Sequence, residues 1–368
     1  MHRLDELFMN ILHGPLCSYY TAKTRAYLSY KHIPFVETHD IAAYRNRVVP
    51  ALGFTVFPVL EISEGEFLQD TTVIIDELEG RNPSRPAFPE DPVLMLVTRI
   101  VEFFIDELWV VTAMHTRWND PRARRFAFEE FNQYFGTGNE KEHWSNGDIV
   151  AEQMQNHIPG LGIDSASGQQ VMQRLFEEAT QLLNQAVGPR QFAFGPRPGL
   201  VDCCLYTGYF AHQYRDDGSA QRYLKSQAPA LSYFIDKMHA AYSTPATGDL
   251  ELTEAFLNYL QYIGPIGATY ATSVMALAQP IVEAAEPGEE LKQVLWPEIE
   301  LFGQKYKRNC TIFSAWKAQR VKDAYVGLSD DNKKEATELM TLIGWRDFLL
   351  TPSSTRIERV GVSLQRSN

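Results

Sequence analysis

The sequence predicts a small mixed α/β unit at the N-terminus, followed by a much longer region that is almost entirely helical. Over residues 8–79, short apolar runs led by proline or closed by turn residues alternate with helical patterns. Residues 81–89 carry three prolines among small and polar neighbours, which is typical of a domain linker. Beyond residue 91, apolar residues recur at helical spacing with few signals for strands.

The α/β unit is expected to begin with a strand over residues 8–13, which Gly14-Pro15 closes. A helix over residues 19–31 follows, with Ser18 or Thr21 suited as its N-cap. A second strand lies at residues 33–37. A polar loop, two further strands and a helix complete the unit. This order predicts a compact fold of the thioredoxin type.

The most informative part of this unit is its second half. Pro58 should start a strand, because proline has no amide hydrogen for a sheet ladder. Asp70 and Thr71 open an apolar helical run, so a carboxylate, a hydroxyl and free helix N-terminal amides come together there. These residues predict a receptor for a small anion.

The remaining chain is expected to divide into further parts. The predicted divisions are 1–80 for the α/β domain, 81–92 for the linker, 93–245 for an all-helical domain, 246–352 for a helical extension and 353–368 for a poorly ordered tail. Residues 136–162 are expected to form a loop. Helices are expected over residues 93–109, 127–135, 169–187, 200–214, 231–242, 252–263, 268–283, 289–301, 312–325 and 331–350.

Composition excludes several classes of protein. A net charge of −12 over 368 residues, with no basic stripe, argues against a nucleic-acid partner. No apolar run approaches the roughly 20 residues that cross a bilayer, and the N-terminus lacks the pattern of a secretion signal. The four cysteines are scattered and lack CxxC spacing, so we expect no metal site and no disulfide framework. A soluble, cytoplasmic protein is therefore expected.

Four segments, taken in order, resemble one family. Residues 18–25 (Ser-Tyr-Tyr-Thr-Ala-Lys-Thr-Arg) are similar to Ser-Pro-Tyr-Ser-x-Lys-Val-Arg, and residues 57–60 (Phe-Pro-Val-Leu) to Val-Pro-x-Leu. Residues 70–74 (Asp-Thr-Thr-Val-Ile) resemble Glu-Ser-x-Ala-Ile, and residues 199–202 (Gly-Leu-Val-Asp) stand where the family has Ser/Thr-x-x-Asp. With the linker and the helical region, residues 8–243 resemble the cytosolic glutathione transferases.

The departures from the family pattern are specific. Tyr19 replaces a proline, Asp70-Thr71 replaces Glu-Ser, and Phe57 is bulkier than valine. Gly199 supplies no side-chain oxygen, so only Asp202 remains of the helix capping box. The extension of roughly 120 residues lies outside the family's two-domain plan. These differences preserve the expected glutathione site but leave the class of enzyme open.

The resemblance implies a catalytic role for Ser18, whose hydroxyl would donate a hydrogen bond to the glutathione sulfur. A free thiol titrates at about 8.5, and each unit of lowering corresponds to about 1.4 kcal/mol. The bond from the hydroxyl and the helix dipole would together favour the thiolate. Cys17 is the alternative. A thiol at a helix N-terminus would have a depressed pKa and could form a mixed disulfide with glutathione.

The resemblance also assigns binding roles. A cis Pro58 would present the backbone of Phe57 to the cysteinyl unit of glutathione. Asp70 and Thr71 would hold the γ-glutamyl group, with an added hydrogen bond from Gln69. The glycyl carboxylate would pair with a further cation, for which Arg45 and Arg47 are the candidates. The acceptor pocket is expected among Phe104, Trp109, Met114 and His115.

Three functions follow as expectations. The leading one is a glutathione S-transferase active in detoxification, which uses glutathione as co-substrate and no metal to attack a hydrophobic electrophile. A second keeps glutathione but performs reduction, isomerisation or ether cleavage. A third is a non-catalytic binding or scaffold protein with the same fold. The resemblance further implies a homodimer.

Overall fold

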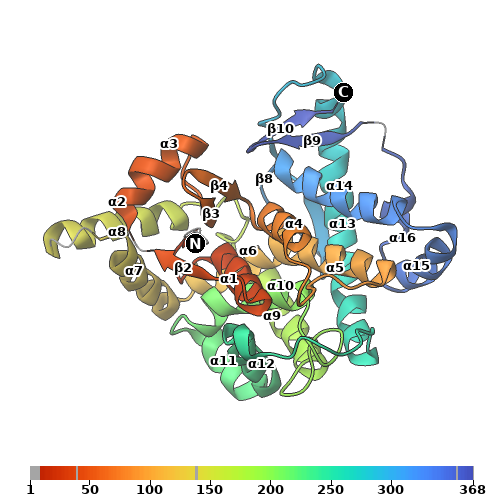
Figure 1. The fold of residues 1–368 in the computed structure, drawn as a ribbon, viewed down its shortest axis with the longest axis horizontal. Coiled ribbons are helices and arrows are strands. Elements are labelled where there is room, and N and C mark those ends of the chain that lie inside the picture. The colour runs from red at the N-terminus through yellow and green to blue at the C-terminus, as the bar shows by residue number, and fades with distance from the viewer. Residues whose placement is uncertain (1–8, 39, 137–139, 354, 368) are drawn as a thin grey trace, which may run out of the picture.

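The computed structural model describes residues 9–38, 40–136, 140–353 and 355–367. In Figure 1 the small sheet domain lies at the upper left, the helical bundle lies below it, and the C-terminal part of the chain covers the right-hand side. The predicted thioredoxin-like N-terminal domain followed by helical domains is confirmed.

The N-terminal domain is a four-stranded mixed sheet in the order β2-β1-β3-β4. The β1–β2 pair is parallel, and β3 runs antiparallel to both β1 and β4. The strands are β1 (Asn10–His13), β2 (Phe35–Thr38), β3 (Val59–Ser63) and β4 (Glu66–Gln69). The helical segments are α1 (Tyr19–Lys31), α2 (Ile41–Ala43), the π-helical η1 (Tyr44–Val48), α3 (Val49–Leu52) and α4 (Thr71–Arg81).

The helical domain begins at Asp91, whose carboxylate caps the helix that starts with Pro92. One continuous rod follows, in which the π-helical η2 joins α5 to α6. Its elements are α5 (Pro92–Phe104), η2 (Ile105–Trp109), α6 (Val110–Trp118), α7 (Pro121–Phe135), α8 (Glu140–Gln155), α9 (Ala166–Ala186), α10 (Leu200–Tyr209), the π-helical η3 (Phe210–Tyr214), α11 (Ser219–Gln227), α12 (Pro229–His239) and the 3-10 turn η4 (Ala241–Ser243).

Three helices in this region lie outside the predicted ranges. The first is α6, which continues the helix that was expected to end at residue 109. The loop predicted over residues 136–162 is wrong in its middle, because α8 occupies Glu140–Gln155. Its polar and glycine-containing sequence hid the helical pattern. The short helix α11 also escaped prediction, because Leu224 is the one large aliphatic side chain that it buries.

The extension is largely helical, as predicted, but it also contains strands that were not expected. Residues predicted as a helix over 289–301 instead form strands, and residues 252–283 form one helix in which Pro265 and Pro280 are accommodated. The elements are α13 (Glu254–Ala284), β5 (Val294–Leu295), β6 (Glu298–Leu301), β7 (Gln304–Lys307), β8 (Cys310–Thr311), α14 (Ile312–Val326), α15 (Asp330–Leu342) and α16 (Arg346–Leu350).

The signals for these strands are local. Along β6, buried Ile299 and Leu301 alternate with exposed glutamates, which is the period of a strand. Phe302 and Gly303 both have positive φ, at 54° and 74°. A two-residue turn with both φ values positive matches the twist of an antiparallel hairpin.

The prediction of a poorly ordered tail is also corrected by the structure. Residues 357–366 form an antiparallel hairpin of β9 (Ile357–Val360) and β10 (Ser363–Arg366), which turns at Gly361 with φ of 59°. The hairpin docks on α14, because the Gln319 side chain accepts from the Ile357 amide and donates to its carbonyl, both at 2.9 Å. Buried Ile357 and Leu364 supply an apolar face.

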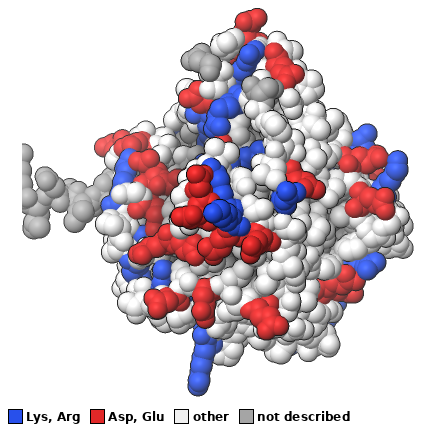
Figure 2. Space-filling model, turned by 90° about the vertical axis from the view of Figure 1, so that its right-hand side faces the viewer, with Lys and Arg blue, Asp and Glu red and all other residues white. Residues whose placement is uncertain are grey.

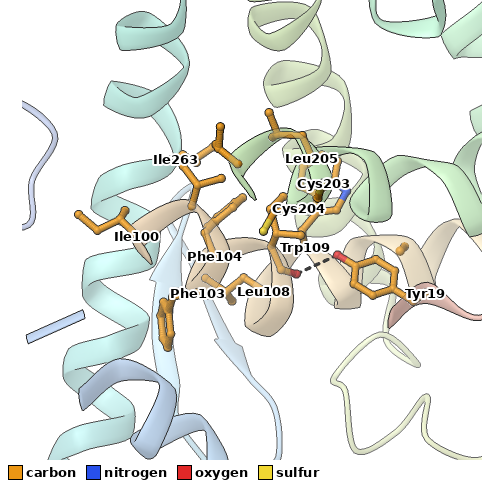
Figure 3. Packing of buried hydrophobic residues seen from close by; sticks show 14 of the residues in the cluster. Tyr19, Ile100, Phe103, Phe104, Leu108, Trp109, Cys203, Cys204, Leu205 and Ile263 are labelled. Carbon is orange, nitrogen blue, oxygen red and sulfur yellow. Dashed lines mark hydrogen bonds between the residues drawn. The ribbon is translucent and has the colours of Figure 1, made fainter. Parts of the chain in front are cut away.

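The core lies where α5, η2, α10 and α13 meet. Figure 3 shows Phe103, Phe104 and Trp109 packed among aliphatic and cysteine side chains of the neighbouring helices. The dashed line in the same view is the hydrogen bond from Tyr19 of α1 to the carbonyl of Ile105, at 2.8 Å. The N-terminal domain is thus tied to the helical core by its first helix.

The surface agrees with the negative charge of the sequence. On the face drawn in Figure 2, acidic side chains form a broad band in which lysines and arginines are interspersed. No described helix has both the length and the apolar character that a membrane span requires.

Candidate functional site

A cavity of about 520 Å³ lies between the N-terminal domain and the helical domain. One wall comes from the start of α1 and the segment before β3, and the other from α6, α7, α8 and η3. The lining residues are Pro15, Cys17, Ser18, Tyr19, Tyr20, Ile41, Tyr44, Arg45, Thr55, Val56, Phe57, Val110, Met114, Arg117, Trp118, Phe131, Phe135, Val150, Gln153, Met154 and His212. The far wall is mostly apolar and aromatic, and suits a hydrophobic ligand.

Ser18 lies at the N-terminus of α1, at the edge of this cavity. Its Oγ accepts a hydrogen bond from the Thr21 amide at 3.3 Å and so caps the helix. Because this bond uses a lone pair of the oxygen, the hydroxyl hydrogen is still available to donate to a ligand. The positive end of the helix dipole lies at the same place and favours an anion.

Cys17 also lines the cavity, but its environment differs from the one expected for a reactive thiol. The residue is 3% exposed. Burial raises the pKa of its thiol to about 11, although the nearby Arg117 acts in the opposite direction. The thiol therefore stays protonated at neutral pH, where a mixed-disulfide mechanism needs a thiolate. The expected depression of its pKa is wrong.

Arg117 is a site residue that the sequence analysis missed. Its guanidinium bonds both carboxylate oxygens of Asp216, at 2.6 and 2.9 Å, and the carbonyl oxygen of Cys17 at 3.0 Å. All of these groups are buried. Arg117 thereby positions the turn that precedes Ser18. No sequence spacing relates positions 17, 117 and 216, so only the fold reveals this contact.

Two tyrosines fix the other side of this turn. Tyr20 donates to the carbonyl of Asp106 at 2.8 Å, and Tyr19 donates to that of Ile105. Both acceptors lie in the π-helical η2, where the altered helix register leaves carbonyl groups available. The position of Ser18 therefore depends on contacts between domains.

Phe57 and Pro58 lie on the same side of the cavity as Ser18. The peptide bond between them is cis. The β3 ladder starts only at Val59, so the backbone of Phe57 precedes the sheet hydrogen bonds. The Phe57 ring packs near Tyr44 and Phe135, with centroids 4.7 and 6.1 Å away. The backbone of Phe57 is thus placed to pair with an extended peptide ligand.

The two arginines proposed for a carboxylate have different surroundings. Arg47 is paired with Glu61 at 2.5 Å, and this buried glutamate also contacts His13 at 3.3 Å. Arg45 is exposed and lines the cavity. Of the two, Arg45 is the one placed to contact a ligand, while Arg47 balances a buried carboxylate.

Asp70, Thr71 and Gln69 lie at the start of α4, outside the lining of the cavity. Asp70 has φ of +72°, an uncommon conformation for a residue with a side chain and one that often occurs at functional sites. Its Oδ1 accepts from the Thr72 amide at 2.9 Å. Thr71 is 1% exposed, and its Oγ1 has no hydrogen-bond partner within the described chain.

The C-terminal extension contacts this end of α4, which the sequence did not predict. Lys317 of α14 lies 3.9 Å from the Asp70 carboxylate and 3.2 Å from the Thr72 hydroxyl. Arg359 of β9 donates to both the carbonyl and the side-chain oxygen of Gln69, each at 2.8 Å. The ligand receptor predicted at Asp70 and Thr71 therefore has a cationic neighbour on the extension.

A buried ionic cluster anchors Lys317. Its ammonium bonds Asp106 at 2.5 Å, and Lys23 of α1 bonds Asp106 and Glu102 at 3.0 and 2.7 Å. Burial opposes ionisation of Glu102, but Lys23 and further cations outweigh it and hold the pKa well below its usual range. The N-terminal domain, the helical domain and the extension thus meet at one set of alternating charges.

Three of the four residues predicted for the acceptor pocket lie elsewhere. Phe104 and Trp109 are fully buried in the core, as Figure 3 shows, and the Trp109 indole donates to the carbonyl of Gly208 at 3.1 Å. His115 contacts Asn119 and Gln173 instead of the cavity. Met114 lines the cavity. The prediction failed because an apolar helix face looks the same in sequence whether it packs or binds.

Asp202 keeps its expected part of the capping box. Its Oδ2 accepts from the Gly199 amide and its Oδ1 from the Ala193 amide, both at 2.8 Å. Arg25 of α1 pairs with Glu37 of β2 at 2.9 Å. These contacts stabilise the fold around the site.

Within the described residues, no cluster of three or more His, Cys, Asp or Glu side chains has the arrangement of a metal site. All four cysteines are buried free thiols.

Comparison with known families and structures places this geometry in context. Residues 12–86 match the sequence model described as the N-terminal domain of glutathione S-transferase. This range contains Ser18, Phe57, Pro58 and the start of α4. A comparison with curated proteins finds no match.

Several solved structures are similar to part of the chain. A glutathione S-transferase from Methylobacillus flagellatus KT with glutathione bound is 19% identical, with 68% of this chain and 98% of that chain covered and a TM-score of 0.39. The beta-etherase LigF from Sphingobium sp. strain SYK-6 is 15% identical, with 69% and 100% covered and a TM-score of 0.39. A bacterial maleyl pyruvate isomerase of the zeta class is 15% identical, with 68% and 95% covered and a TM-score of 0.35.

Likeness at this level carries no argument about activity. What the comparisons show is a likeness of residues 12–86 to the N-terminal domain of the glutathione S-transferases. This range holds the four-stranded sheet in the order β2-β1-β3-β4, apart from the first residues of β1.

Proposed function

We propose that the protein is a glutathione transferase in which Ser18 stabilises the thiolate of bound glutathione. The observation that carries the proposal is the position of the Ser18 hydroxyl, at the N-terminus of α1 and beside a largely apolar cavity of about 520 Å³. The thiolate would form next to Ser18. A hydrophobic electrophile would occupy the cavity between α6, α7 and α8.

The tripeptide would extend from the cavity toward α4. The Phe57 backbone would pair with its cysteinyl unit, Asp70 and Thr71 would bind the γ-glutamyl end, and Arg45 would reach the glycyl carboxylate. In the reaction the glutathione sulfur forms a bond to an electrophilic carbon, and a leaving group departs or an adjacent double bond takes up a proton. Ser18 donates a hydrogen bond throughout and changes no covalent bond.

Cys17 provides the alternative chemistry, a glutathione-dependent reduction. Its burial and its raised pKa, about 11, favour Ser18 over Cys17 as the functional group. Isomerisation and ether cleavage use the same thiolate and differ only in the second substrate. Pairing of two copies, a cytoplasmic location and a role in detoxification stay predictions of the resemblance.

The test combines binding with kinetics. Glutathione binding is measured by calorimetry, the thiolate by its ultraviolet absorbance against pH, and transfer by rates with a panel of electrophiles. Ser18→Ala should raise the pKa of bound thiol by about one unit and lower kcat/KM about 10- to 100-fold. Ser29→Ala, elsewhere on α1, is the matched control and should change neither.

Two outcomes would reject the proposal. Absence of glutathione binding at millimolar concentration would leave a binding or scaffold protein as the better description. Activity that survives Ser18→Ala but is lost in Cys17→Ala would instead identify a reductase.

A further inference from the structure

We propose that the C-terminal extension completes the glutathione site by supplying Arg359 and Lys317 to the γ-glutamyl carboxylate. This inference rests on the proposed function and adds residues far outside the segment that matches the family, which ends at residue 86. The ligand group that they would take is the amino-acid end of a peptide, with one ammonium and one carboxylate.

The guanidinium group of Arg359 lies at the start of α4, and some of its N–H donors have no hydrogen-bond partner among the described residues. One nitrogen donates to both oxygens of Gln69. Its Nε and its other terminal nitrogen are buried and have no partner within the described chain. Burial lowers the pKa of Arg359, and the neighbouring Asp70 carboxylate opposes that change. Each of these two nitrogens can still donate one hydrogen bond to an oxygen of a carboxylate ligand.

Thr71 provides the second, independent observation. Its hydroxyl is buried and has no partner among the residues that the structure describes, and it belongs to the first turn of an 11-residue helix. Free amide hydrogens and the helix dipole favour an anion at this position. Among the described residues, unsatisfied polar atoms are therefore found both on Thr71 of the helix and on Arg359 of the extension, which is hydrogen-bonded to Gln69.

The charges match a zwitterionic ligand. Asp70 Oδ2 has Lys317 at 3.9 Å, beyond hydrogen-bond distance, so this oxygen can still accept from a ligand ammonium. Lys317 and Arg359 would then face the carboxylate of the same amino-acid group. A γ-glutamyl unit carries both charges on one carbon, which fits a receptor with an acid and two cations.

The extension holds these cations in fixed positions. Lys317 is part of the buried cluster with Asp106. Arg359 lies on the hairpin that Gln319 ties to α14, and its guanidinium carbon lies 5.8 Å from the centre of the Trp316 ring. In Figure 1 β9 lies above α14, and α4 lies below both. A site held this way needs little reorganisation when the ligand binds.

The test uses calorimetry on the full-length protein with three ligands. These are glutathione, 4-aminobutanoyl-Cys-Gly, which lacks the γ-glutamyl carboxylate, and glutaryl-Cys-Gly, which lacks the ammonium. Wild type should bind each analogue about 10- to 100-fold more weakly than glutathione. Arg359→Gln should weaken glutathione by about the same factor but leave 4-aminobutanoyl-Cys-Gly unchanged.

The matched control is Arg356→Gln. This arginine lies on the same segment, is exposed and pairs with Asp323 at 2.8 Å, so its loss should leave all three affinities unchanged. Circular dichroism checks that each variant is folded. The affinities of wild type for glutathione and for 4-aminobutanoyl-Cys-Gly can be compared without any variant. Their ratio tests whether the protein recognises the γ-glutamyl carboxylate.

The outcomes separate this inference from the proposed function. If wild type binds glutathione but Arg359→Gln binds it equally well, or loses glutathione and 4-aminobutanoyl-Cys-Gly to the same extent, the extension is not part of the site. The same holds if wild type does not distinguish glutathione from 4-aminobutanoyl-Cys-Gly. If wild type binds no glutathione, both proposals are overturned.

Discussion

The two ends of the candidate site differ in how they are built. Around Ser18 the walls are apolar side chains and the space is open, with a cavity of about 520 Å³. At the start of α4, charged side chains of the extension lie beside Asp70 and Gln69, and Thr71 is 1% exposed. The cavity beside Ser18 can hold second substrates of many shapes. The charges at the start of α4 suit one chemical group.

This difference shows how one domain is used for two purposes. The sheet domain contributes a helix N-terminus at each end, α1 at Ser18 and α4 at Thr71. The groups around each terminus differ in chemistry. Apolar side chains of the second domain border a cavity beside α1, whereas Lys317 of the ionic cluster lies beside α4.

The largest expected effect concerns the ionic cluster. Lys317→Met removes one cation from buried Asp106 and should lower the free energy of unfolding by about 3–5 kcal/mol, because it leaves a buried charge underpaired. Urea denaturation measures the change. Lys305→Met breaks an exposed pair with Glu298 and should cost at most about 1 kcal/mol. Equal effects of the two substitutions would show that the cluster adds no special stability.

A second pair of substitutions separates packed core from cavity wall. Phe104 is fully buried, so Phe104→Ala should cost about 3–5 kcal/mol of stability. Met114 borders open space, and Met114→Ala should cost about 1 kcal/mol or less while raising KM for a hydrophobic acceptor. Thermal denaturation measures the change in stability, and steady-state kinetics measure the change in KM. If Met114→Ala proves as destabilising as Phe104→Ala, Met114 belongs to the core.

The smallest effect concerns Cys17. Because burial raises its pKa to about 11, its thiolate fraction should rise about tenfold per pH unit from pH 7 to about pH 10. The measurement is the rate of alkylation by iodoacetamide, followed by peptide mass spectrometry. Free glutathione in the same tube, with a thiol pKa near 8.5, should approach its plateau earlier. A plateau for Cys17 below pH 8 would mean a thiolate at neutral pH and would favour the reductase mechanism.

The sequence determined much of the N-terminal half by itself. Ser18 before a helix, Pro58 before a strand and Asp70 before an apolar run each depend on local backbone chemistry, namely capping, the missing amide hydrogen and helix dipoles. Such signals require only neighbouring residues. The same reasoning identified the buried helix over residues 200–214, which is apolar nearly all round.

Only the tertiary structure decided which residues meet. Arg117 reaches the carbonyl of Cys17, Lys317 reaches Asp106 and Arg359 reaches Gln69, across separations of 100, 211 and 290 residues. Likewise, Met114 faces the cavity while Phe104 does not, although both are apolar residues of one helical rod. Contacts at such distances depend on how helices pack, and hydrophobic periodicity identifies a buried face without naming what covers it.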